Sequence, residues 1–98
     1  MTETELIKRY AECAKEIGEL VGQKNYAYGD AFRQAGKVLE ILYPAGVKPD
    51  QYIDMLTVVR VLDKLFRVAN KKEAFGESPW KDVAGYSILA AERDSHDE

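Results

Sequence analysis

The sequence predicts an all-α fold, a compact four-helix bundle that forms a single domain. Apolar residues recur at steps of three and four along four segments, which is the spacing of one helix face. No segment shows the alternation of a half-buried strand. A chain of 98 residues with seven glycines and three prolines has room for one core and few linkers. We therefore expect a helical domain over residues 1–94 and a frayed acidic tail over residues 95–98.

The first two helices are expected over residues 4–22 and 30–43. Thr4 would cap the first helix, Gly29 allows a turn, and Asp30 is placed to cap the second helix. The inner face of the first helix would consist of Leu6, Tyr10, Cys13, Ile17 and Leu20. The inner face of the second would consist of Phe32, Ala35, Leu39 and Leu42.

The last two helices are expected over residues 51–70 and from Ser78 onward. Asp50 would cap the third helix, which is the longest and would occupy the centre of the bundle. Its wide apolar arc would consist of Tyr52, Met55, Val58, Val59, Leu62, Leu65 and Phe66. Ser78 followed by Pro79 is typical of a helix start. The packing stripe of the fourth helix would consist of Trp80, Val83, Ala84, Ser87 and Ala91.

Composition argues against several classes of function. The formal net charge is −3, whereas binding to long nucleic acid usually needs a net basic face. No apolar run approaches the roughly 20 residues that span a bilayer, and the acidic start is unlike a signal region, so we expect a cytoplasmic protein. The single cysteine, Cys13, is expected to be a buried thiol in a reducing compartment. Because so short a chain buries only about two-thirds of its unfolded surface, we expect a homo-oligomer.

A first group of functional side chains lies at the boundary between the first two helices. It consists of Lys24, Asn25, Tyr28, Gly29 and Asp30. Backbone amides at the start of a helix attract anions, so Lys24 and these amides could share a phosphate while Tyr28 packs against a base or ribose. The alternative is a capped loop in which Tyr28 plugs the core.

A second group forms one charged stripe on the third helix. Arg60, Asp63, Lys64 and Arg67 fall within about 100° of one another around the helix axis. If the stripe faces solvent, Asp63 pairs with the two arginines. If it lines a cleft, the three cations could bind phosphates while Asp63 orients one of them or holds a metal ion.

A third group consists of Glu77, Asp82 and Tyr86. Asp82 and Tyr86 lie one turn apart, on the face opposite Trp80. The position of Asp82 near the positive end of its helix is worth only about 0.3–1 kcal/mol as a structural feature, which could explain its presence.

The ordered set Lys-Asn-x-x-Tyr-Gly-Asp, Arg-x-x-Asp-Lys-x-x-Arg, Glu-Ser and Asp-x-Ala-x-Tyr resembles a phage and prophage family, the nucleotide-modification-associated domain of the first type. The resemblance covers residues 13 to about 90 and implies a role in nucleotide metabolism, in the host cytoplasm if the chain is phage-encoded. The ligand-binding positions that it implies are Lys24, Asn25, Tyr28, Asp30, Arg60, Asp63, Lys64, Arg67 and Tyr86.

That family is in turn similar to all-helical nucleotide pyrophosphatases of the MazG and dUTPase kind, which hold magnesium between two acidic pairs on neighbouring helices. The chain contains Glu16-x-x-Glu19 but lacks the second pair. It also departs from the phage family itself, in which further acids often occur where Trp80 stands and the gap between Glu77-Ser78 and Asp82 is usually longer. These departures weigh against hydrolysis.

Three functions follow from these patterns. The preferred one is non-catalytic binding of a nucleotide or cyclic nucleotide by Lys24, Arg60, Lys64 and Arg67, with Tyr28 or Tyr86 on the base. In a phage, such a protein could sequester a nucleotide second messenger of host defence. The second is a magnesium-dependent nucleotide pyrophosphatase, which requires the carboxylates of Asp63, Glu77 and Asp82 to converge on the metal. The third is a helical interaction protein whose surplus apolar surface pairs helices between chains.

Overall fold

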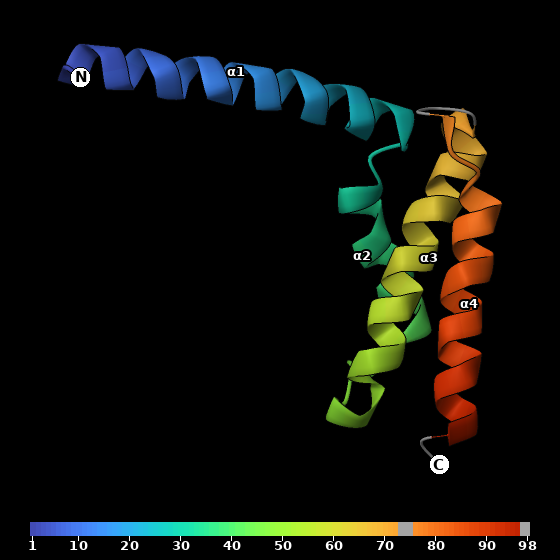
Figure 1. Ribbon diagram of the computed structural model, residues 1–98. Coiled ribbons are helices and arrows are strands. Elements are labelled where there is room, and N and C mark those ends of the chain that lie inside the picture. Colours follow the sequence, from blue (N-terminus) through green and yellow to red (C-terminus); the bar gives the residue numbers. More distant parts are fainter. Residues whose placement is uncertain (73–75, 97–98) are drawn as a thin grey trace.

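The computed structural model describes residues 1–72 and 76–96, and the regular elements in these residues are all helical (Figure 1). The order is α1 (Glu3–Ala27), α2 (Ala31–Leu42), the short 3-10 helix η1 (Pro49–Gln51), α3 (Tyr52–Lys71) and α4 (Pro79–His96). The all-α prediction is therefore confirmed. Within these ranges no helix combines the length and the apolarity that crossing a bilayer would need.

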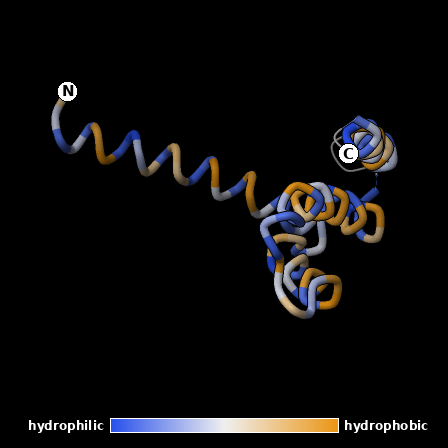
Figure 2. Tube along the Cα trace, turned by 90° about the horizontal axis from the view of Figure 1, so that it is seen from below, coloured by the Kyte–Doolittle hydropathy of each residue, from blue (hydrophilic) through white to orange (hydrophobic). Residues whose placement is uncertain are grey.

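The molecule has the shape of a three-helix body with a projecting arm. α3 lies between α2 and α4 and contacts both, whereas α1 points away from all three and touches α3 only near its own end (Figures 1 and 2). The radius of gyration is 18.2 Å, compared with about 13 Å for a compact chain of this size. The predicted compact four-helix bundle is not what the structure shows, because α1 does not join the other helices.

The arm begins earlier and ends later than predicted. Thr2 caps α1, since its hydroxyl accepts a hydrogen bond from the Glu5 N–H at 3.2 Å and the Glu5 carboxylate accepts one from the Thr2 N–H at 3.3 Å. Thr4 therefore lies inside the helix. Gly22 does not end the helix, because a single glycine in a helix interior costs only about 1 kcal/mol.

The apolar stripe of α1 is exposed instead of buried. Residues 1–26 are all exposed, and Ala27 is the first buried residue of the chain. Tyr10 is 70% exposed and Ile17 is 55% exposed. Cys13 is an exposed thiol, so the prediction that it is buried was wrong. The reason is the direction of α1, which carries the whole stripe away from the helices that would have covered it.

The core is small and is built around α3. Its buried apolar residues are Ala27, Ala31, Ala35 and Leu62. The alanines leave room for α2 to approach α3 closely. Of the predicted inner face of α2, Ala35 is buried and Leu39 is half-buried, but Phe32 is 92% exposed. At the start of α3, Asp50 lies within η1 and does not act as the cap.

α4 begins at Pro79 as predicted but packs through a different face. Its half-buried residues are Asp82, Val83, Tyr86, Ala90 and Arg93. Trp80 is 49% exposed, and the rest of the predicted stripe except Val83 is also exposed. The face that meets α3 is therefore mixed, with two charged side chains and a tyrosine beside Val83 and Ala90. α4 continues to His96, and the remainder of the predicted tail, residues 97–98, lies outside the described residues.

An ion pair fastens the far end of α4 to the start of α3. Arg93 donates a hydrogen bond to the carboxylate of Asp54 and lies 3.3 Å from that of Asp94. The hydrogen bond to Asp54 raises the pKa of the Arg93 guanidinium, which keeps this group charged.

The turn between α1 and α2 sets the direction of the arm. Gly29 and Asp30 both adopt left-handed backbone conformations, with φ of 65° and 57°. A Cβ on Gly29 would overlap the side-chain amide of Asn70, at the end of α3. The amide of Asn70 is itself held by a hydrogen bond of 2.7 Å to the Phe66 carbonyl. Only glycine satisfies both the backbone angle and the close approach.

We predict that Gly29→Ala lowers the free energy of unfolding by about 1–2 kcal/mol from the left-handed angle alone, with a further loss from the overlap with Asn70. The double variant with Asn70→Ala should recover only the stability that is lost through the overlap with Asn70. Urea denaturation followed by circular dichroism measures both. The control is Gly18→Ala, which has open space at its Cβ and should not destabilise the protein, because alanine is the better helix former. Equal effects at positions 18 and 29 would contradict this account of the turn.

Candidate functional site

Two hydrogen bonds between Asn25 and Asp30 hold the first predicted group of side chains together across the turn. The Asn25 side-chain amide donates to the Asp30 carboxylate at 3.1 Å, and the Asp30 N–H donates to the Asn25 carbonyl at 3.0 Å. Asp30 occupies the N-cap position of α2, but its side chain makes no capping hydrogen bond. Its backbone carbonyl accepts from the N–H groups of Arg33 and Gln34. The predicted capping role of the Asp30 side chain was therefore wrong, since Asn25 engages that carboxylate.

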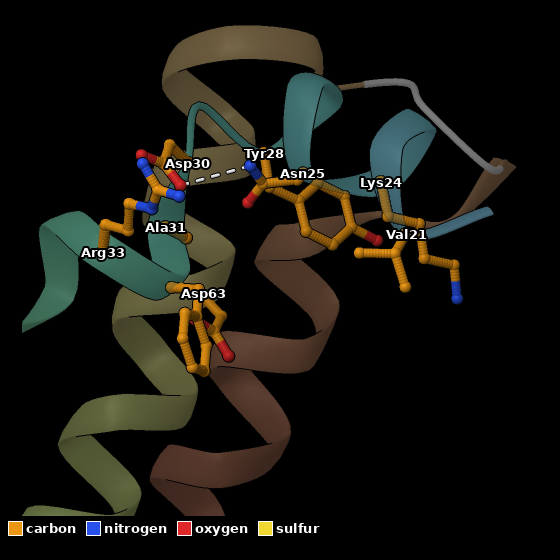
Figure 3. Close-up of a pocket in the computed structure, with 9 residues that line it drawn as sticks. Val21, Lys24, Asn25, Tyr28, Asp30, Ala31, Arg33 and Asp63 are labelled. Carbon is orange, nitrogen blue, oxygen red and sulfur yellow. Dashed lines mark hydrogen bonds between the residues drawn. The ribbon is translucent and has the colours of Figure 1, made fainter. Parts of the chain in front are cut away.

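A cavity of about 560 Å³ opens beside this turn (Figure 3). That volume lies within the range of about 300–1,000 Å³ that is typical of small-molecule sites. The end of α1, the start of α2 and one residue of α3 form its walls. The lining residues are Val21, Lys24, Asn25, Tyr28, Asp30, Ala31, Phe32, Arg33 and Asp63. The structure thus brings four predicted residues of the first group together with Asp63 of the second.

The cavity offers aromatic surface and both signs of charge. The half-buried Tyr28 ring and the exposed Phe32 ring supply the aromatic surface. Lys24 from α1 and Arg33 from α2 supply two cations, and Asp30 and Asp63 supply two carboxylates. In Figure 3 Lys24 and Arg33 lie on opposite sides of Tyr28, and the Arg33 side chain extends toward Asp30. A ligand with an aromatic ring, anionic groups and hydrogen-bond donors would find a partner for each.

Sequence reasoning missed Phe32 and Arg33 as lining residues. Ala31 and Ala35 lie one turn apart and are both buried, so they define the face of α2 that packs on α3. Phe32 and Arg33 then fall outside that face, in the first turn of α2. The two alanines could have indicated this packing face from the sequence, but the larger Phe32 was predicted to lie in the core.

Arg67 lies behind Tyr28 and outside the cavity lining. Its side chain is 1% exposed, its guanidinium carbon is 6.0 Å from the centroid of the Tyr28 ring, and it donates a hydrogen bond to the Glu77 carbonyl. The distance from its Nη1 to the Glu77 carboxylate is 3.9 Å. Within the described part of the chain, its Nε and Nη1 have no hydrogen-bond partner. Arg67 therefore supports the ring that the cavity presents.

The remaining cations of the second group pair with the third group. Lys64 lies 3.2 Å from the Asp82 carboxylate, and the Arg60 guanidinium lies 5.6 Å from the centroid of the Tyr86 ring. Together with Arg67 and Glu77, these contacts form a row along the α3–α4 interface. The stripe is therefore divided, because three of its members lie along this interface and Asp63 lines the cavity. Asp63 makes no ion pair among the residues described, and it lies at the edge of the stripe that borders the cavity.

The predicted metal ligands have separate environments. Asp82 pairs with Lys64, Glu77 lies near Arg67, and Asp63 lines the cavity. In residues 1–72 and 76–96, no group of three histidine, cysteine, aspartate or glutamate side chains is arranged to hold a metal ion. The convergence of carboxylates that a magnesium-dependent hydrolase requires is not met in this part of the chain.

A second hollow of about 590 Å³ lies on the other side of the turn. It is lined by residues that include Tyr26, Asn70 and Lys71, and the Lys71 ammonium is 5.9 Å from the centroid of the Tyr26 ring. Tyr26 is 80% exposed. This hollow has one cation and one solvated ring, so it offers fewer contacts to an anionic aromatic ligand than the cavity beside Tyr28.

No family model, curated protein or solved structure matches this chain. The function is therefore inferred from the geometry of the cavity and from the sequence motifs that line it.

The burial of Arg67 predicts that it contributes far more to stability than its neighbour Lys64. Arg67→Ala should cost about 2–5 kcal/mol, the range for truncating a large buried side chain. The partly exposed Lys64–Asp82 pair should show a coupling energy of only about 0.2–1 kcal/mol in a double-mutant cycle. Chemical denaturation of the wild type and of four variants (Arg67→Ala, Lys64→Ala, Asp82→Ala and the Lys64/Asp82 double variant) measures both quantities. An Arg67→Ala variant as stable as Lys64→Ala would rule out the buried position of this guanidinium.

Proposed function

We propose that this chain is a small nucleotide-binding protein whose ligand occupies the cavity beside Tyr28. The observation that carries the proposal is that Tyr28, Lys24 and Arg33 line one cavity of about 560 Å³. The base packs against Tyr28 and Phe32, whose rings provide flat apolar surface. The phosphates are bound by Lys24 and Arg33 and by the partial positive charge at the start of α2.

The carboxylates of the cavity favour a nucleotide over a simple anion. Two carboxylates accompany the two cations, so the cavity has little net charge and a free phosphate would gain little from it. A nucleotide also carries amino and hydroxyl groups, which donate hydrogen bonds to carboxylates. Asp63 is the better acceptor for these groups, because Asn25 already occupies one oxygen of Asp30.

In this proposal the protein binds its ligand without transforming it. The sequence resembles the phage nucleotide-modification-associated family, and a phage protein of this size is suited to sequestering a nucleotide or cyclic nucleotide signal of host defence. The carboxylate of Asp82 pairs with Lys64 and that of Glu77 lies near Arg67, whereas Asp63 lines the cavity, and these separate partners favour binding over a magnesium-dependent pyrophosphatase activity.

Calorimetric titration of the chain with cyclic dinucleotides, cyclic ADP-ribose isomers and nucleoside triphosphates tests the proposal. We expect binding heat with at least one of these classes. Lys24→Ala and Arg33→Ala should each weaken that binding by about tenfold, which corresponds to about 1.4 kcal/mol for one charged contact. Tyr28→Ala should weaken it at least as much, because it removes the stacking surface.

Two matched controls distinguish the cavity from general electrostatic attraction. Lys15→Ala removes a cation from the exposed arm, and Lys64→Ala removes one from the α3–α4 interface. Both variants should bind with wild-type affinity. The proposal fails if no nucleotide class gives heat above the dilution baseline, or if the control variants weaken binding as much as Lys24→Ala does.

A further inference from the structure

The arm formed by α1 leaves a long apolar face uncovered. All residues from 1 to 26 are exposed, although the helix contains leucine, isoleucine, valine and tyrosine side chains on one side. Figure 2 shows apolar positions recurring along the arm at each turn, well away from the other helices. No other segment in residues 1–72 and 76–96 covers this face.

A helix with this sequence needs a packing partner. Helices without tertiary contacts are marginal in water, and most helical stability in proteins comes from burial of an amphipathic face. α1 also contains Gly18 and Gly22, which lower its intrinsic tendency to stay helical. A continuous helix of 25 residues is therefore best explained by a second surface that covers its apolar side.

The apolar face has the repeat of a coiled coil. Leu6, Tyr10, Cys13, Ile17 and Leu20 follow one another at steps of four, three, four and three. These steps average 3.5 residues, which keeps the seam facing a partner helix along its length. The residues that follow Leu6, Cys13 and Leu20 are also apolar, namely Ile7, Ala14 and Val21. Two lysines and both glycines of the helix lie outside this widened seam, namely Lys8, Lys15, Gly18 and Gly22. They therefore leave no gap or buried charge in the apolar contact.

We propose that α1 of a second copy of this chain covers this face, with the two helices antiparallel. The charges that flank the seam select this partner and its direction. Arg9 precedes Tyr10 and Glu16 precedes Ile17, so both lie on the same edge of the seam. An antiparallel pairing brings this edge against the same edge of the second copy, where Arg9 meets Glu16 and Glu16 meets Arg9.

A parallel pairing would not satisfy these charges. It would set Arg9 and Glu16 against the opposite edge of the partner's seam, which carries Ile7, Ala14 and Val21. In the antiparallel register, Leu6 packs beside Ile17 and Tyr10 beside Cys13 of the second copy. In the single chain, Arg9 and Glu16 form no ion pair with any of the residues described.

The antiparallel pairing also places the second copy close to the cavity. With Leu6 beside Ile17, the start of one α1 lies next to Leu20 and Val21 of the other. Val21 lines the cavity. The first residues of the second copy would therefore border the cavity, although the pairing itself does not depend on any nucleotide.

Analytical ultracentrifugation of the full chain without ligand tests the pairing. We expect a dimer of the 11.1 kDa chain at micromolar concentrations. Ile17→Glu, which puts a charge in the seam, should raise the dimer dissociation constant at least a hundredfold, and Lys15→Glu, on the opposite face of the same helix, should leave it within about threefold. A wild-type chain that stays monomeric up to about 100 μM, or equal effects of the two variants, would overturn the proposal.

A charge swap tests the antiparallel direction separately and does not depend on the folding of the Ile17→Glu variant. Arg9→Glu and Glu16→Arg should each weaken the dimer by about tenfold, because each places two like-charge pairs across the seam. The double variant should return to within about threefold of the wild type. A double variant as weak as the product of the single variants would overturn the antiparallel arrangement.

Discussion

The left-handed turn at Gly29 and Asp30 is the constraint on which the other features of the molecule depend. Two consecutive residues with positive φ reverse the chain within a few residues, and Asn25 holds them there through its hydrogen bond to Asp30. The same turn directs α1 away from α2, α3 and α4, and it places Tyr28 between the buried Arg67 and the cavity. The cavity and the projecting arm therefore have a common origin.

The charged residues along one stripe of α3 have two kinds of neighbour. Arg60 and Lys64 contact Tyr86 and Asp82 of α4, and Arg67 contacts Glu77, which comes just before α4. Asp63, next to Lys64 in sequence, lines the cavity instead. A single helix thus contributes contacts to α4 and a carboxylate to the cavity wall. In the proposed function, phosphate binding therefore falls to the cations that line the cavity, Lys24 and Arg33.

The sequence was sufficient to predict the helices and the turns but not their packing. The positions of α2, α3 and α4 were predicted to within a few residues, because the apolar period, Gly29 and Pro79 are local signals. Periodicity identifies which residues share a face, but it does not reveal what covers that face. The stripe around Cys13 was correctly grouped on one face, yet it was assigned to a core that α1 never joins.

The packing face of α4 was predicted wrongly for a related reason. Trp80 is the most apolar large residue near the start of that helix, so its face was predicted to pack. The observed contact uses Asp82 and Tyr86, whose partners on α3 are a lysine and an arginine. A pattern of hydrophobicity does not predict such pairs, because the stability that each polar residue contributes depends on the residue opposite it on the other helix. For the candidate site, the local motif from Lys24 to Asp30 was recognised, whereas Arg33 depended on the three-dimensional turn.

The geometry of the turn makes the far end of α1 sensitive to small changes in the backbone torsions at Gly29 and Asp30. A helix of 25 residues is about 37 Å long, and its fulcrum is a pair of backbone torsions beside the cavity. A rotation of about 10° at that fulcrum would sweep the far end through about 6 Å. A small change in these torsions would therefore move the far end of α1 by many times the local adjustment.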